Sequence, residues 1–170
     1  MSSSTAVNLL TRQLKELTKN PVEGFSAGLV DDNILEWRIG IIGPEGSLYE
    51  NGYLTAHLTF TENYPNEPPT MRFVTKMWHP NIYPDGRVCI SILHQPGDDQ
   101  FGYEQAGERW LPIHTVESII LSVISLLTPL VPDISSPANI DAAIEVRDNL
   151  KSYQRKVRRL AEQSLEDAYQ

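Results

Sequence analysis

The chain has 170 residues, 41% of them hydrophobic, which is enough for the core of one ordinary domain. Its formal net charge of −8 argues against a basic surface for duplex nucleic acid, so we expect no nucleic-acid partner. No apolar run approaches the roughly 18 residues of a membrane span, and the first residues lack a secretory signal pattern. We therefore expect a single domain over residues 1–170, without a membrane span.

The first half of the chain predicts one helix followed by strands. Apolar residues recur at helical spacing over residues 5–18, and Asn20-Pro21 ends this helix. The hydrophobic period then changes to two, which predicts strands over residues 25–30, 34–41, 53–60 and 71–73. Consecutive strands with short connections predict an antiparallel meander.

The last third of the chain predicts helices. From Thr115 the apolar residues form a wide helical stripe that reaches Leu127, so this helix should be mostly buried. Ser136 and Pro137 fit the cap and the first residue of the next helix. Two helices are expected over residues 138–149 and 153–168. Because strands and helices are segregated along the chain, the sequence indicates an α+β fold.

A basic cluster lies in the last predicted helix: Lys151, Arg155, Lys156, Arg158 and Arg159. In a chain with a negative net charge, we interpret it as a solvated helix face.

The central segment, residues 75–114, has neither period and is rich in proline and glycine. Long irregular segments in a compact domain are usually functional. This one contains Cys89, the only cysteine in the chain. One thiol cannot form an internal disulfide, so the sequence favours a reducing compartment, the cytoplasm or the nucleus.

The surroundings of Cys89 restrict its chemistry. A free thiol has a pKa of about 8.5, so a small fraction is ionised at neutral pH, and that fraction suffices for an electrophile as reactive as a thioester. A cysteine protease needs a paired histidine, and none of His57, His94 and His114 forms a protease signature with Cys89. One cysteine and four scattered histidines do not give the paired spacing of a zinc site. We expect no metal.

Two further residues of the central segment draw attention. The amide of Asn81 could stabilise an oxyanion, or it could only pin its loop by binding backbone groups, and the sequence leaves both open. His79, restricted by the proline that follows it, is better suited to a structural role.

These residues resemble a known family. His79-Pro80-Asn81, followed eight residues later by Cys89, resembles the active-site signature (the HPN motif) of ubiquitin-conjugating enzymes. Further resemblances lie in residues 21–28, 64–69 and 110–112, so the similarity covers nearly the whole chain. An acidic insertion over about 95–107 and the Ser-Pro-Ala-Asn run at 136–139 are similar to the G-type, Ubc7-like branch.

The resemblance implies a mechanism. Cys89 would accept ubiquitin from an activating enzyme as a thioester, and a substrate lysine would then attack the carbonyl with help from a ligase. The chain has no phosphate-binding loop, so ATP would be used by the activating enzyme and no cofactor is expected here. The branch implies polyubiquitin chains for proteasomal degradation, in the cytoplasm or nucleus, with recruitment to the endoplasmic reticulum surface by a partner.

The resemblance leaves the lysine-side group open. Family members often place an acidic or hydroxyl side chain opposite the cysteine to help the amine lose its proton. Here the usual Asp-Pro-Asn after the buried helix is replaced by residues 128–133. The candidates for this group are Asp133, Ser135 or Ser136 and, in the acidic insertion, Asp98 and Asp99.

The resemblance also implies partner surfaces. The first helix contacts the activating enzyme, and RING-type ligases contact this helix and the two loops that contain residues 64–69 and 110–112. The expected partner-binding residues are Arg12, Lys15, Tyr64, Pro65, Asn66, Trp110, Pro112 and Ile113. Asn66 stands where an apolar residue is common, which weakens one anchor, whereas Pro112 and Ile113 keep their apolar contacts.

Two alternatives remain. The chain could be a non-catalytic module of the same fold that binds ubiquitin or a ligase, an alternative that the altered segment 128–136 favours and that Cys89 and Asn81 oppose. It could also conjugate another ubiquitin-like modifier, although the acidic insertion favours ubiquitin by analogy.

Overall fold

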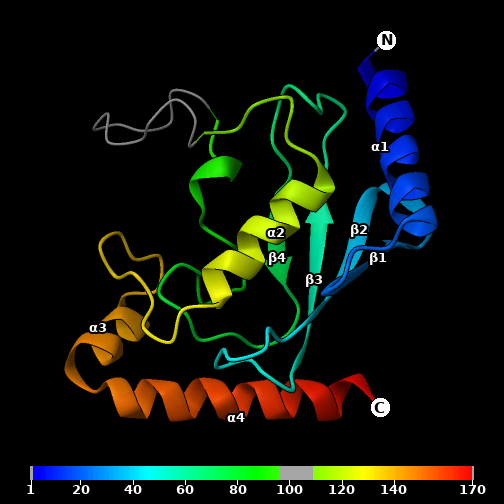
Figure 1. Cartoon of the computed structure of the whole chain (residues 1–170). Coiled ribbons are helices and arrows are strands. Elements are labelled where there is room, and N and C mark those ends of the chain that lie inside the picture. Colours follow the sequence, from blue (N-terminus) through cyan, green and yellow to red (C-terminus); the bar gives the residue numbers. More distant parts are fainter. Residues whose placement is uncertain (1, 96–108, 170) are drawn as a thin grey trace.

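The computed structural model describes residues 2–95 and 109–169 (Figure 1). Its helices are α1 (Ser2–Lys19), α2 (Val116–Leu127), α3 (Ile140–Asp148) and α4 (Leu150–Ala168). Its strands are β1 (Phe25–Val30), β2 (Asn33–Ile42), β3 (Tyr53–Thr59) and β4 (Thr70–Phe73), and a short 3₁₀ turn, η1, covers Ser91–Leu93.

The four strands form one antiparallel sheet in the order β1-β2-β3-β4. Alternate residues of β2, namely Trp37, Ile39 and Ile41, are fully buried, so one face of the sheet belongs to the core. The α+β meander predicted from the hydrophobic periods is therefore confirmed.

The helices cover this sheet in distinct places. Figure 1 shows α2 crossing the sheet, α1 beside the β1–β2 edge, and α4 along one end. Thr115 caps α2 by accepting a hydrogen bond from the Ser118 N–H, and the stripe from Val116 to Leu127 is buried as expected. At the far end, the Ser164 hydroxyl accepts from the Tyr53 N–H at 3.1 Å, which ties α4 to β3.

Helix α1 begins at Ser2, before the predicted residue 5, and both C-terminal helices also start at residues other than those predicted. Helix α3 begins at Ile140 because Asn139, not Ser136, caps it: the Asn139 Oδ1 accepts from the Ala142 N–H at 3.0 Å. The prediction of Pro137 as the first helical residue is therefore wrong. Helix α4 begins earlier than predicted, at Leu150, because Asn149 is its cap.

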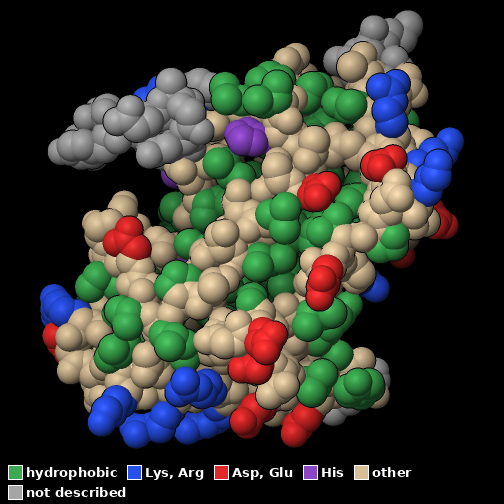
Figure 2. All heavy atoms as spheres, viewed as in Figure 1, with side chains coloured by type: hydrophobic (Ala, Val, Ile, Leu, Met, Phe, Trp, Pro, Cys, Tyr) green, Lys and Arg blue, Asp and Glu red, His purple; other side chains and the backbone are tan. Residues whose placement is uncertain are grey.

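The basic cluster lies along the first half of α4. Lys151, Arg155, Arg158 and Arg159 are exposed, and Figure 2 shows basic side chains gathered along this part of the helix. The Lys156 ammonium instead lies 3.5 Å from the centroid of the Trp78 ring. Most of the cluster is thus a solvated face. Within the described residues, no helix is long and apolar enough to cross a membrane.

Candidate active site

The turn formed by His79, Pro80 and Asn81 is held by the imidazole of His79. This side chain is 2% exposed. Its Nδ1 accepts from the Asn81 N–H at 3.0 Å, and the ring also bonds to the backbone of Leu126 on α2. His79 therefore satisfies backbone groups on both sides, which is the structural role that its sequence position suggests.

Burial lowers the pKa of His79 from its ordinary 6.5 to about 4, although the bond to Leu126 opposes this shift. The unfolded chain therefore binds a proton between these two pH values that the folded chain does not. As the pH falls from 6.5 toward 4, we expect the free energy of unfolding to drop by up to about 3 kcal/mol from this group. Imidazole NMR should show His79 neutral down to about pH 5; titration near pH 6.5 would contradict the burial argument.

Helix α3 and the segment just before it make hydrogen bonds that hold the same turn. The Pro80 carbonyl accepts from the Ala138 N–H at 2.7 Å and from the Asn139 N–H at 2.9 Å. The Trp78 indole N–H donates to Glu145 on α3 at 2.9 Å. The segment before α3 therefore packs directly on the turn that carries Asn81.

Cys89 is partly exposed, and its backbone lies beside this turn. Its N–H donates to the Asn81 carbonyl at 2.9 Å, and its Sγ lies 3.8 Å from the Nε2 of His94. The thiol opens on a cavity of about 200 Å³, lined in part by Met71, Tyr83, Arg87, Leu93 and His94. The structure thus brings together Cys89, Asn81 and His79, which the sequence separates by up to ten residues.

The side chain of Asn81 is unusual. Its Oδ1 is buried and has no hydrogen-bond partner among the described residues. Burying an unpaired polar atom costs about 1–3 kcal/mol. A side chain that only pinned the loop would be expected to make the bonds that stabilise it. Among the described residues, the Asn81 Oδ1 therefore does not pin the loop by accepting a hydrogen bond.

The candidates for the lysine-side group are placed as follows. Asp133 and Ser136 are both exposed, in the segment between α2 and α3. The Asp133 Oδ1 accepts from the Ser135 N–H at 2.9 Å, and this bond holds the Asp133 pKa below its usual range. Ser136 lies two residues before Ala138, whose N–H binds Pro80. Asp98 and Asp99 lie outside the described residues.

The predicted partner residues divide into two groups. Tyr64 and Trp110 are 2% and 1% exposed, so their side chains hold the loops together rather than forming a contact surface. The Trp110 indole donates to the Pro65 carbonyl at 2.8 Å, and the Tyr64 hydroxyl accepts from Gln13 on α1 at 2.9 Å. Pro65 itself is half-buried. The exposed members are Arg12, Lys15, Asn66, Pro112 and Ile113, the last of them 81% exposed.

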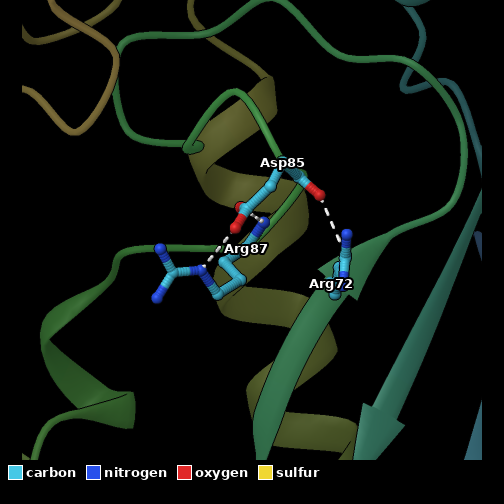
Figure 3. A network of polar contacts seen from close by, with 3 residues as sticks. All are labelled: Arg72, Asp85 and Arg87. Atoms are coloured by element: carbon cyan, nitrogen blue, oxygen red, sulfur yellow. Dashed lines mark hydrogen bonds and ion pairs between the residues drawn. The ribbon is translucent and has the colours of Figure 1, made fainter.

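A charged network beside Cys89 was not anticipated from the sequence (Figure 3). The Asp85 carboxylate accepts from the Arg87 Nε at 2.8 Å and from the Arg87 backbone N–H at 3.0 Å. The backbone carbonyl of Asp85 accepts from the Arg72 Nε at 2.9 Å. A signal was present: Arg87 lies two residues before Cys89, and such residues share one side of an extended chain. Among the described residues, no group of three or more His, Cys, Asp or Glu could hold a metal.

These features describe a class of domain: an α+β fold with a single cysteine, Cys89, beside an Asn81 turn that His79 holds in place. The comparisons agree with this class, because residues 9–161 match the family model described as ubiquitin-conjugating enzyme. The chain belongs to the ubiquitin-conjugating enzyme family and is a transferase.

Individual relatives show to which branch of the family the chain is similar. The chain is 57% identical to ubiquitin-conjugating enzyme E2 15 of Schizosaccharomyces pombe, over 98% of this chain and 99% of that protein. It is 47% identical to the human enzyme E2 G2, over 96% and 98% of the two chains. The solved structure of human E2 G1 superposes with a TM-score of 0.62 at 57% identity, covering 70% of this chain and 91% of that one. The G-type, Ubc7-like assignment is thereby confirmed.

Proposed function

We propose that Cys89 accepts ubiquitin from an activating enzyme as a thioester and passes it to a lysine. The observation that carries this proposal is the bond from the Cys89 N–H to the Asn81 carbonyl, at 2.9 Å, which holds the only thiol of the chain beside the Asn81 turn. In the charging step the Cys89 thiolate attacks the carbonyl of the incoming thioester. A new C–S bond forms, the C–S bond to the activating enzyme breaks, and the sulfur of the activating enzyme leaves as the thiolate. ATP is used by the activating enzyme, so this chain requires no cofactor of its own.

The second step is aminolysis. A neutral lysine amine attacks the thioester carbonyl, the C–N bond forms, the C–S bond breaks, and the sulfur of Cys89 leaves as the thiolate. The amine must also lose a proton, so a nearby acceptor helps. The oxygen of the tetrahedral intermediate carries negative charge, and the Asn81 amide is the proposed donor to it.

We propose that Asp133 and Ser136 form the lysine side of the site, because their segment is joined to Pro80 through Ala138. If so, Asp133→Asn or Ser136→Ala should slow discharge to free lysine about tenfold or more. Formation of the thioester should stay near the wild-type rate, since a thiol needs less positioning than an amine. Single-turnover discharge measures the first effect and charging measures the second. If both variants discharged at the wild-type rate, the segment would have no part in the transfer.

The partners follow from the family, which acts with ubiquitin, an activating enzyme and ligases. We propose that the ligases are of the RING type and that they contact the exposed residues Asn66, Pro112 and Ile113. Arg12 and Lys15, exposed on α1, are the proposed contacts for the activating enzyme. The proposed outcome is polyubiquitin on protein substrates for proteasomal degradation, in the cytoplasm or nucleus, with a partner that recruits the enzyme to the endoplasmic reticulum.

A charging assay tests the core of the proposal. The protein is incubated with activating enzyme, ATP and ubiquitin, and the products are separated with and without reductant. An adduct that reductant removes is expected, and its absence would refute the proposal. Parallel reactions with other ubiquitin-like modifiers test the alternative specificity. A thioester that never discharges, even with a ligase, would support the non-catalytic alternative.

A further inference from the structure

Arg87 and Cys89 line the same cavity. The segment between them is extended, because Arg87 bridges to Arg72 on β4 and Val88 bridges to Ile82. In an extended chain, residues two apart point to the same side, separated by about 6.6 Å. The Arg87 and Cys89 side chains therefore lie on the same side of this segment, and both line the same cavity.

Two neighbouring side chains, Asp85 and Tyr83, contact the guanidinium. Its Nε donates to the Asp85 Oδ2 at 2.8 Å, and its carbon lies 4.6 Å from the centroid of the Tyr83 ring. The turn beneath it is also rigid: the Tyr83 N–H donates to the Arg87 carbonyl at 2.8 Å, and the Phe73 N–H donates to the Gly86 carbonyl at 2.8 Å. Gly86 has a φ of +99°, and a Cβ there would strike the Phe73 carbonyl, so glycine is required.

The two terminal nitrogens of the Arg87 guanidinium can donate hydrogen bonds to a ligand. Asp85 engages only the Nε and the backbone N–H, and no other described side chain pairs with the two terminal nitrogens, which point away from the network in Figure 3. The Arg87 side chain is 60% exposed. Two arginines and one aspartate leave this network with a net charge of +1, on a chain whose net charge is −8. Paired terminal nitrogens match the two oxygens of a carboxylate.

We propose that Arg87 binds a carboxylate of the acceptor, an Asp or Glu two residues from the lysine that receives ubiquitin. The spacing follows from the geometry: an extended acceptor also places alternate side chains on one side, about 6.6 Å apart. A lysine directed at Cys89 therefore brings the side chain two positions away over Arg87. Arg87 is thus a specificity-determining residue for the acceptor. This inference rests on the proposed function, because it needs a thioester on Cys89.

The test uses the full chain, charged with ubiquitin and then freed of ATP. Four peptides, each with one lysine, carry Glu or Gln two residues before or after that lysine. The measured quantity is the ratio of single-turnover discharge rates, Glu over Gln, because a general loss of activity cancels in it. For an exposed, pre-organised ion pair we expect a ratio of about five at one of the two positions, reduced in high salt. The variant Arg87→Gln should bring the ratio to about one.

Arg155→Gln is the matched control, since Arg155 is an exposed arginine of α4 that does not line the cavity. It should keep the wild-type ratio. A wild-type ratio of one at both positions would overturn the proposal without any variant, and so would a preference that survives in Arg87→Gln. Charging is read before the peptides are added, so a failure to form the thioester refutes the proposed function separately, and this inference with it.

Discussion

Cys89→Ser is expected to abolish the reductant-sensitive adduct with ubiquitin and to lower transfer to lysine by more than about a thousandfold. Cys89 is the only cysteine of the chain, so no other thiol can replace it. The serine hydroxyl is far less ionised at neutral pH than a thiol, and the ester it forms is less reactive toward an amine than a thioester. Any adduct on the variant should therefore persist in reductant. Electrophoresis with and without reductant measures both properties.

The control for this experiment is Arg155→Gln, which changes an exposed residue of α4. It should form the reductant-sensitive adduct like the wild type. Cys89→Ser should also keep the wild-type melting temperature, because the Cys89 N–H that binds Asn81 is a backbone group that the substitution retains. A reductant-sensitive adduct on Cys89→Ser would place the thioester outside this chain and contradict the proposed function.

The hydrophobic periods were sufficient to predict the sheet and the buried helix, because both depend on which residues face the core. They were insufficient for the start of α3. There the N–H groups of Ala138 and Asn139 bind Pro80, a residue 58 positions earlier than Ala138, and the Asn139 side chain becomes the cap. A cap fixed by such a distant contact leaves no periodic signal, so Ser136 was the locally reasonable choice.

The candidate site was likewise predictable from the sequence only in part. The resemblance grouped His79, Asn81 and Cys89, which the structure places side by side, and it treated Tyr64 and Trp110 as contact residues. Only the three-dimensional structure reveals that these two aromatic side chains are buried and hold their loops by hydrogen bonds. Likewise, no sequence pattern can reveal that the Oδ1 of Asn81 is buried without a partner, because this depends on the packing of residues from several segments.

The second large expected effect concerns the Asn81 amide, whose Oδ1 makes no hydrogen bond with the described residues. If the Asn81 amide stabilises the oxyanion of the lysine step, Asn81→Ala should slow discharge to free lysine about a hundred- to a thousandfold. Charging should change by less than about tenfold, because exchange between thioesters needs less positioning. The free energy of unfolding should fall by less than about 1 kcal/mol, since among the described residues the substitution breaks no side-chain hydrogen bond, and it removes an unsatisfied polar atom.

Asn139→Ala is the matched control for this variant. It removes an asparagine that does bond within the fold, as the cap of α3, and keeps the backbone N–H that binds Pro80. It should cost about 1 kcal/mol of stability and change discharge far less than Asn81→Ala does. Chemical denaturation and single-turnover discharge, run on both variants, therefore separate the two roles that the sequence left open. If Asn81→Ala instead lost about 2 kcal/mol or more of stability and discharged normally, Asn81 would pin the loop, and the oxyanion donor would have to be another group.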